Sequence, residues 1–278
     1  MPNLDLSVII PFKDKAAMTL DCVRSLQEFG PSLKEILLVS NNSSAHELQE
    51  VQRGVEGIKE AKVLVYDHPF NYQKINNWAA KQATGKVLFF FNNDTELKPQ
   101  STELMQRMYS KAMEPDVGMV GCLLLFGDGH TIQHGGVFLL PKGQADHMYA
   151  GRRFSQVTAP SRNTQLFPYD ITKDMPMTAV TGAAQMVEAK KFWGIHGFDE
   201  RFIICGGDVD LCIRLNHAGN QTWFVGGGYI IHKESQSRAF KPIPYNDFYW
   251  SYLSYMQGFD INTGDPFLPL LTNKSEYR

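Results

Sequence analysis

Apolar runs and helical patterns alternate regularly through the first third of the chain. Residues 6–11 (LSVIIP) form a continuous apolar run, which is typical of a strand covered on both faces. Similar runs follow at 35–39, 62–66 and 87–91. The intervening helices are predicted from apolar spacing in 20–29, from a polar segment after residue 44 and from 72–83. This alternation predicts an α/β fold with a doubly wound, mostly parallel sheet.

The pattern becomes irregular after residue 94. Apolar runs at 117–125, 180–187 and 222–231 predict further strands, and 211–217 predicts a helix that ends at Ala218-Gly219-Asn220. Residues 127–173 are rich in Gly, His, Arg and Pro without clear periodicity, and such a stretch inside a compact domain is more often functional than idle. No repeat or linker divides the chain, so we expect a single domain with an aromatic tail from about residue 245.

Composition and charge restrict the class of protein. An apolar fraction of 43% can fill a substantial core, and a net charge of −2 gives no basic field for binding nucleic acid. No apolar run approaches the roughly 20 residues that a membrane span needs, and the N-terminus lacks a signal-peptide pattern. The four cysteines form no C-x-x-C pair, which indicates reduced thiols. The default expectation is a cytoplasmic protein.

The segment 89–94 (FFFNND) is the first candidate for chemistry. A buried strand ends there in Asn92-Asn93-Asp94. Because ligands of an open parallel sheet bind outside the carboxyl ends of its strands, Asp94 is expected to face a ligand. A carboxylate with neighbouring amide oxygens suits Mg²⁺ or Mn²⁺ carrying phosphates. An Asx turn after a strand is the structural alternative.

Two further strand ends and one helix start are expected beside Asp94. Residues 11–14 (PFKD) and 40–43 (SNNS) offer backbone groups, hydroxyls and amides that suit a nucleobase and ribose. Residues 71–77 (NYQKINN) place amides and a lysine at a helix start, where they can meet phosphate oxygens or simply be solvated. The glycine motifs of dinucleotide-binding folds and of P-loop proteins are missing from the sequence, so both classes lose support.

Two later segments carry carboxylates and a histidine. Asp208 and Asp210 follow Gly206-Gly207 at the entrance of the predicted helix. Helix capping explains one carboxylate, but it explains neither the second nor the bare glycine backbone, which lets a ligand approach. One of the pair is therefore a candidate general base. His232 ends an apolar run and can join Asp94 on a metal, and Arg238 can pair with a diphosphate.

Taken together, these segments resemble a known family. The order PFKD, VSNNSS, FNYQKINN, FFFNND, AVTGA, GFDERF, GGDVDLCIRL and HKESQSR, over about residues 6–240, is similar to inverting glycosyltransferases of family two. The similarity is greatest to the bacterial branch that builds O-antigen and capsule polysaccharides, often as rhamnosyltransferases. The resemblance implies a GT-A fold: a Rossmann-like central sheet flanked by helices, with a smaller acceptor-side sheet and irregular loops.

The resemblance also implies a division of labour along the chain. Residues 1–115 would form the nucleotide-binding half, 116–244 the acceptor and catalytic half, and 245–278 a tail. Asp94, in the place of the D-x-D motif, and His232 would hold Mn²⁺ or Mg²⁺. Asp208 matches the catalytic base, and Asp210 matches its supporting partner.

The expected substrates are a dTDP- or UDP-sugar donor and a hydroxyl of a glycan or lipid-linked saccharide, which would bring the protein to the inner face of the cell membrane. The residues expected at the nucleotide donor are Pro11, Phe12, Lys13, Ser40, Asn41, Asn71, Lys74, Asn76, Asn93 and Arg238. The residues expected at the acceptor are His134, Gly182, Ala183 and Gly207.

Three positions depart from the family pattern. Ser40 stands where an aspartate usually contacts uracil, Asn92 replaces the first carboxylate of D-x-D, and Gly207 replaces a frequent glutamate. The departures at Asn92 and Gly207 leave open a nucleotide- or carbohydrate-binding module that has lost catalysis. A sugar nucleotidyltransferase is the second alternative, although it would need a more basic loop after the first strand than Lys13 and Lys15 supply. The absence of a Q-x-x-R-W segment argues against a processive polymerase.

Overall fold

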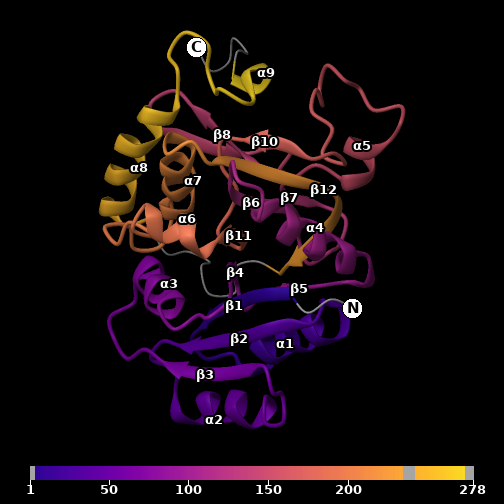
Figure 1. Cartoon of the computed structure of the whole chain (residues 1–278). Helices are drawn as coiled ribbons and strands as arrows, with labels where there is room; N and C mark the ends of the chain where they lie inside the picture. Colours follow the sequence, from indigo (N-terminus) through magenta and orange to yellow (C-terminus); the bar gives the residue numbers. More distant parts are fainter. Residues whose placement is uncertain (1–3, 234–241, 273–278) are drawn as a thin grey trace.

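A mixed sheet forms the centre of the molecule in the computed structural model, which describes residues 4–233 and 242–272 (Figure 1). The strands run in the order β10-β12-β6-β11-β4-β1-β2-β3, while β5 pairs with β12 and β7 pairs with β6. The bounds of these strands are β1 (Leu4–Phe12), β2 (Leu33–Ser40), β3 (Ala61–Val65), β4 (Val87–Phe91), β5 (Thr95–Glu96), β6 (Val117–Leu125), β7 (Ile132–His134), β10 (Met175–Met177), β11 (Ala184–Glu188) and β12 (Gln221–His232). A separate antiparallel pair consists of β8 (Val137–Leu140) and β9 (Gln144–His147).

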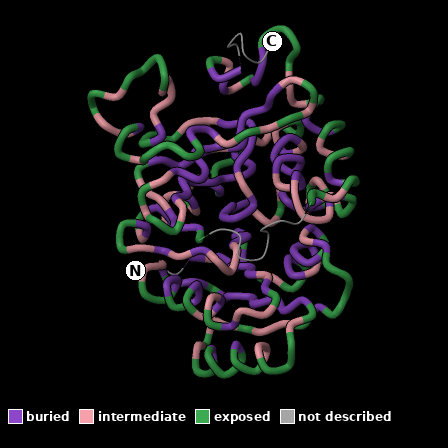
Figure 2. The backbone as a smooth tube through the Cα atoms, turned by 180° about the vertical axis from the view of Figure 1, so that it is seen from behind, coloured by how far each residue is buried: buried purple, intermediate pink, exposed green. Residues whose placement is uncertain are grey.

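The predicted parallel sheet is present in the first half of the chain. β4, β1, β2 and β3 pair in parallel, whereas β11 runs antiparallel to both β4 and β6. Helices cover the sheet, and α2 lies beside the edge strand β3, where Figure 2 shows mostly exposed residues. The helices are α1 (Ala16–Phe29), α2 (Ala45–Gly54), α3 (Tyr72–Ala80), the 3₁₀ turn η1 (Pro99–Ser101), α4 (Thr102–Ala112), α5 (Phe154–Thr158), α6 (Ala189–Gly194), α7 (Gly207–His217), α8 (Tyr245–Gly258) and α9 (Pro269–Thr272).

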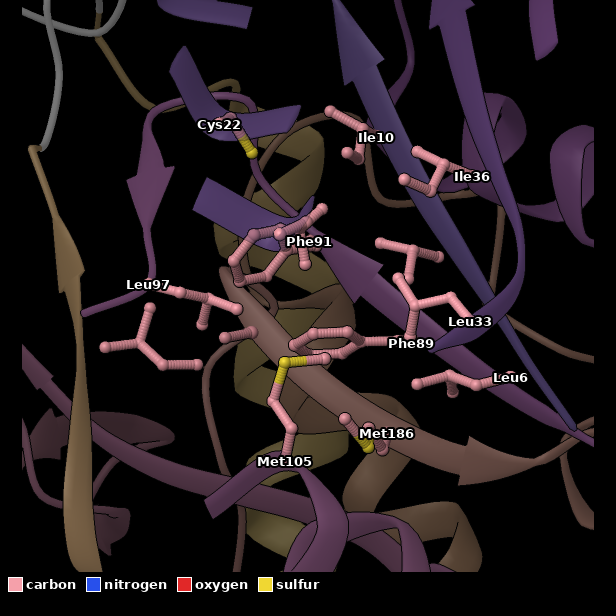
Figure 3. Packing of buried hydrophobic residues seen from close by; sticks show 14 of the residues in the cluster. Leu6, Ile10, Cys22, Leu33, Ile36, Phe89, Phe91, Leu97, Met105 and Met186 are labelled. Carbon is pink, nitrogen blue, oxygen red and sulfur yellow. The ribbon is translucent and has the colours of Figure 1, made fainter. Parts of the chain in front are cut away.

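The phenylalanine strand β4 is buried on both faces, as its continuous apolar run predicts. Side chains alternate across a strand, so Phe89 and Phe91 enter one core and Phe90 enters another. Figure 3 shows the first core, where Phe89 and Phe91 lie among Cys22 of α1 and Met105 of α4. On the other face Phe90 packs within 5.3 Å of the Phe192 ring. This burial fixes the strand end from which Asp94 emerges.

Several predicted boundaries differ in the structure, and two of them lie beside Asp208. The strand predicted over 180–187 begins only at Ala184, because residues 181–183 form a loop whose backbone groups bind other parts of the chain. The helix predicted over 211–217 begins at Gly207, since Gly206 adopts a φ of +85° at its N-cap and allows the chain to turn into the helix there. The irregular stretch 127–173 contains three short strands and the short helix α5.

A bulge in β12 directs the end of this strand toward β5. The pairing of β12 with β6 is interrupted at residues 226–228 (GGG), and Gly227 has a φ of +74°. A Cβ at Gly226 would lie 2.4 Å from the backbone nitrogen of Lys173, so only glycine fits there. Beyond the bulge, β12 continues beside β6 and also pairs with β5.

The aromatic tail forms the helix α8, which packs on α7 (Figure 1). Tyr255 is buried against α7, and the Trp250 ring lies 3.8 Å from the Arg201 guanidinium. Other aromatic side chains of α8, such as Tyr245 and Phe248, are exposed. Part of the tail therefore covers the core.

Candidate active site

Asp94 and His232 meet where the end of β12 reaches the turn after β4. β12 pairs with β5 directly after that turn, with His232 opposite Thr95, and the Lys233 N–H donates to the Asp94 carbonyl. His232 Nε2 consequently lies 3.0 Å from Asp94 Oδ1. The two side chains are only 10% and 13% exposed. The structure thus brings together the two residues that the sequence assigns to a metal.

The donor set of Asp94 and His232 fits a divalent cation. Gln133 Oε1 lies 2.6 Å from His232 Nδ1 and orients the ring, so that Nε2 is the ring nitrogen that faces the Asp94 carboxylate. Two ligand atoms that bind one ion at about 2.1 Å and at a right angle lie about 3 Å apart, which matches this spacing. Within residues 4–233 and 242–272, no group of three or more His, Cys, Asp or Glu side chains is placed so that it could hold a metal ion by itself. A bound diphosphate and water would therefore supply the remaining ligands.

The loop 181–183 (TGA) joins the turn of Asp94 to α7. The Asn92 N–H donates to the Ala183 carbonyl at 3.0 Å. The Gly182 N–H donates to Asp208 Oδ2 at 2.7 Å. Because these two bonds lie on successive residues of one short loop, the turn that carries Asp94 and the first turn of α7 are held in one frame.

Tyr72 adds a second link between the same elements. Its hydroxyl lies 3.1 Å from Asn92 Oδ1 and 3.0 Å from the Gly182 carbonyl oxygen. The Tyr72 N–H also donates to the Ile203 carbonyl at 2.7 Å, in the loop before α7. The first residue of α3 therefore contacts the metal side of the site and the approach to α7.

Asp208 lies in the first turn of α7 and is partly exposed. Neither Asp208 nor Asp210 occupies the N-cap, which is Gly206, although Asp208 accepts one N–H group of the first helical turn. Asp208 Oδ2 accepts from Gly182, and Oδ1 accepts from the Val209 N–H at 3.0 Å. Each oxygen keeps a second lone pair. The carboxylate is thus oriented by backbone donors and remains able to accept a proton.

Asp210 connects α7 to its surroundings. Its Oδ2 accepts from Arg214 Nε at 2.7 Å, and its Oδ1 accepts from Ser254 Oγ of α8 at 2.7 Å. Arg214 also donates to the Ile195 carbonyl. Both oxygens of Asp210, which is 6% exposed, are therefore engaged by α7 and α8.

The loop before α7 is held by the tail helix. The fully buried Asp247 carboxylate of α8 accepts from the backbone N–H groups of Ile203, Ile204 and Cys205. The distances are 2.5, 2.8 and 3.0 Å. A carboxylate that accepts several backbone donors forms strong hydrogen bonds. Asp247 thus fixes the chain immediately before Gly206.

The predicted nucleobase and ribose residues lie at the carboxyl ends of β1 and β2. Phe12 pairs with Ser40, and the Asn41 N–H donates to the Phe12 carbonyl at 2.9 Å, so Pro11, Phe12, Ser40 and Asn41 are adjacent. Asn41 Nδ2 donates to two carbonyls that follow β3, while its Oδ1 is buried without a partner. Lys13 is exposed beside them.

The predicted phosphate residues of α3 lie in different environments. Asn71 caps the helix through the Lys74 N–H at 2.8 Å and donates to the Glu200 carbonyl at 3.0 Å. Asn76 is fully buried, and its Oδ1 has no partner. Lys74 is exposed. The side chain of Asn71 is thus occupied structurally, and the exposed Lys74 remains the cation of this helix start.

Asn93 and Arg238 were also predicted to lie at the nucleotide donor. Asn93 Nδ2 donates to Thr19 Oγ1 of α1 at 3.0 Å, which ties the turn after β4 to that helix. Arg238 lies outside the described residues, so its predicted contact with the diphosphate stays a prediction.

His134 lies behind the loop 181–183. It is fully buried, and its Nε2 lies 3.4 Å from the Thr181 backbone nitrogen. Burial, followed by the charges of His147 and His232, holds the pKa of His134 well below its usual range. His134 is consequently neutral and supports the loop that carries Gly182 and Ala183.

Three residues of the site had no predicted role. Tyr72 stands within a motif, but its hydroxyl contacts lie 20 and 110 residues away in sequence. Gln133 precedes His134 in the irregular stretch, and Asp247 lies in the tail. No local sequence pattern predicts the role of any of these three residues, because their contacts are with residues that are distant along the chain.

Comparison with known proteins identifies a family model and two relatives with similar sequences. Residues 7–134 match the model of glycosyl transferase family 2. The O-antigen biosynthesis protein RfbC of Myxococcus xanthus is 39% identical over 264 residues, which is 94% of this chain and 20% of that protein. The uncharacterized protein y4gI of Sinorhizobium fredii is 28% identical over 244 residues, or 86% of this chain and 25% of its own length. The chain therefore spans about a fifth to a quarter of these relatives.

Solved structures share the fold. GalNAc-T7 with UDP, GalNAc and Mn²⁺ superposes with a TM-score of 0.65 at 16% identity, over 92% of this chain and 48% of that one. The mannosyltransferase PcManGT from Pyrobaculum calidifontis, with GDP-Man and Mn²⁺, has a TM-score of 0.61 at 12% identity, covering 92% and 74%. The fold is thus GT-A, as the resemblance implied. In the described parts of the chain, no helix has both the length and the apolar character needed to cross a membrane.

Proposed function

Residues 7–134 match the model of glycosyl transferase family 2, and on this ground we propose that the protein is an inverting glycosyltransferase. It moves a sugar from a dTDP- or UDP-sugar to a hydroxyl of a glycan or lipid-linked saccharide, in the synthesis of a bacterial surface polysaccharide. The relation to an O-antigen biosynthesis protein supports this acceptor class. Such an acceptor favours action at the cytoplasmic face of the membrane.

The observation that carries the proposal is the orientation of Asp208. Its carboxylate is held by the Gly182 and Val209 N–H groups, and the loop that carries Gly182 also bonds to the turn of Asp94. The helix N-terminus places a partial positive charge beside it. Asp208 removes the proton from the acceptor hydroxyl while that oxygen attacks the anomeric carbon, and the bond from this carbon to the diphosphate breaks on the opposite face.

Asp94 and His232 hold Mn²⁺ or Mg²⁺ in this proposal. The 3.0 Å spacing of their ligand atoms supports this role, as does the presence of Mn²⁺ in the structures of GalNAc-T7 and PcManGT. When bound, the ion supplies Lewis-acid neutralisation of the diphosphate leaving group. Gln133 orients His232, and Tyr72 and Asn92 orient the turn that carries Asp94.

Substitution of the proposed base tests the function. In Asp208→Asn the amide oxygen can still accept the hydrogen bond from the Gly182 N–H, but the basic carboxylate is lost. The rate of sugar transfer should therefore fall by about 10²–10⁴-fold. The assay follows release of UDP or dTDP from a panel of nucleotide sugars, with octyl glycosides as acceptors. Binding of the nucleoside diphosphate with Mn²⁺ should stay unchanged.

Asp116→Asn, an exposed carboxylate outside the site, is the matched control and should transfer at the wild-type rate. Nearly full turnover by Asp208→Asn would refute the base assignment. A wild-type protein that binds nucleotide but transfers no sugar would favour the binding-module alternative. Release of pyrophosphate from a nucleoside triphosphate and a sugar phosphate would instead indicate a nucleotidyltransferase.

A further inference from the structure

The space beside Gly207, at the start of α7, is filled by Gln73 of α3. A Cβ placed on Gly207 would lie 2.5 Å from Gln73 Cδ, 2.6 Å from its Nε2 and 2.9 Å from its Oε1. These separations are shorter than any real contact, so the carboxamide of Gln73 occupies the volume that a side chain at position 207 would enter. The bare backbone of Gly207, which the sequence predicts to let a ligand approach, accommodates Gln73.

The side-chain oxygen of Gln73 is buried without a hydrogen-bond donor. Gln73 is 1% exposed, and its Oε1 has no hydrogen-bond partner. A buried carbonyl oxygen is rarely left unpaired in a folded protein, since the unmade bond destabilises the native state. A group that persists in this condition beside a reaction centre is expected to find its partner in the ligand-bound state.

The neighbours of Gln73 place it at the reaction centre. Tyr72, the preceding residue, contacts Asn92 and Gly182 through its hydroxyl. Gly207, on which the carboxamide lies, directly precedes Asp208. The terminal torsion of a glutamine is broad, so a small rotation over the hydrogen atoms of Gly207 can turn Oε1 toward an incoming group.

We propose that Gln73 binds a hydroxyl of the sugar at the point of transfer and thereby contributes to substrate specificity. The proposal rests on the proposed function. A neutral carboxamide that can accept from and donate to one partner matches a sugar hydroxyl, which does both. The donor sugar and the saccharide acceptor carry the same chemistry, so the experiment has one arm for each.

Gln73→Leu removes the polar atoms and keeps the bulk. Loss of one hydrogen bond to the sugar is expected to weaken its binding about tenfold. In the donor arm, affinity for the nucleotide sugar falls while affinity for UDP or dTDP with Mn²⁺ stays unchanged. In the acceptor arm, KM for the octyl glycoside rises while KM for the donor stays unchanged. The melting temperature should not fall, because the variant removes an unsatisfied oxygen from the interior.

Gly207→Ala tests the same contact from the other side. Its methyl group displaces the carboxamide, so the variant should reproduce the binding loss of Gln73→Leu. In a Gln73→Ala background, where the space beside Gly207 is free, Gly207→Ala should cause little further loss of sugar binding. Non-additivity of this kind identifies two residues that act through one contact. Gln82 is an exposed glutamine just beyond α3, and Gln82→Leu is the matched control. It should change neither the donor affinity nor the KM for the acceptor.

The outcomes separate this inference from the proposed function. An active wild-type protein together with unchanged donor affinity and acceptor KM in Gln73→Leu overturns the inference alone. A lower melting temperature with unchanged sugar binding also overturns it and makes Gln73 a packing residue. A wild-type protein that is inactive with every donor and acceptor overturns the proposed function itself.

Discussion

At the scale of single residues, Glu35 shows how a buried charge is stabilised at the end of the sheet opposite the site. Its side chain is 3% exposed. It accepts from Ser7 Oγ, from Thr84 N–H and Oγ1, and from Lys62 Nζ at distances between 2.7 and 2.9 Å. Burial alone would raise the pKa of Glu35, but these donors outweigh it and lower the pKa to about 2.

The lowered pKa predicts an acid-sensitive fold. Because the folded state binds the proton of Glu35 more weakly than the unfolded state, this contribution is present above the ordinary pKa of 4.5 and is lost as the pH falls toward 2. The lowered pKa of Glu35 corresponds to a contribution on the order of 3 kcal/mol to the free energy of unfolding. Glu35→Gln should destabilise the protein at pH 7 by roughly 2 kcal/mol and flatten this pH dependence in urea titrations.

Glu56→Gln, an exposed glutamate, is the control and should leave the pH profile unchanged. An unchanged profile in Glu35→Gln would contradict the assignment. The sequence places Glu35 at the start of a strand but could not predict its role. Its partners lie 27 to 49 residues away and approach only in the folded sheet.

At the scale of elements, α8 stabilises the loop that leads into α7. Without the Asp247 carboxylate, the N–H groups of residues 203–205 lose their acceptor. Asp247→Asn offers these donors a single neutral oxygen, so we expect a loss of roughly 2 kcal/mol in unfolding free energy. Transfer should fall further than stability alone explains, because Gly206 and Asp208 follow this loop. Thermal unfolding and the transfer assay measure the two effects.

The neighbouring exposed Asn246 provides the control, and Asn246→Ala should retain both stability and transfer. Wild-type activity in a destabilised Asp247→Asn protein would limit α8 to a structural role. The sequence predicts α1 from its apolar spacing and β4 from its continuous apolar run, because both signals are local. It could not predict the link between α8 and the loop, since a single polar residue has no period.

The difference between local apolar patterns and distant polar contacts also explains why the strand predicted over 180–187 begins later in the structure. Apolar residues at 180–187 read as one strand, but the backbone of 181–183 bonds to Asn92 and Asp208 and leaves the sheet. Asp94, Asp208 and His232 were predicted because each stands at the end or start of a recognisable element. Their roles are proposals, whereas the contact of His232 with Asp94 and the bond of Asp208 to the loop 181–183 are properties of the fold.

At the scale of the whole molecule, the site joins the two halves of the sheet, so a ligand that bridges them should stabilise the entire fold. A nucleoside diphosphate with Mn²⁺ at 100 times its Kd adds about 2.7 kcal/mol to the unfolding free energy. The melting temperature should rise by about 5 °C. EDTA should abolish most of this shift, because under the proposed function Asp94 and His232 bind the diphosphate through the ion.

Asp94→Asn should remove the Mn²⁺ dependence of the shift while Asp116→Asn retains it. A shift of equal size with EDTA would show that the nucleotide binds without the ion and would refute the metal role of Asp94. The experiment also distinguishes the bases, since Ser40 replaces the aspartate expected beside uracil and a dTDP compound serves as the comparison.

The return of β12 to the turn of Asp94 has a consequence for biosynthesis. Asp94 and His232 are 138 residues apart in sequence, and their contact depends on the pairing of β12 with β5. A nascent chain that has left the ribosome as far as residue 134 already contains Asp94, but neither Asp208 nor His232 exists yet. Under the proposed function, such a chain cannot consume nucleotide sugar. A stalled or clipped fragment is therefore inert, and activity arises only after β12 has been synthesised and joined to the sheet.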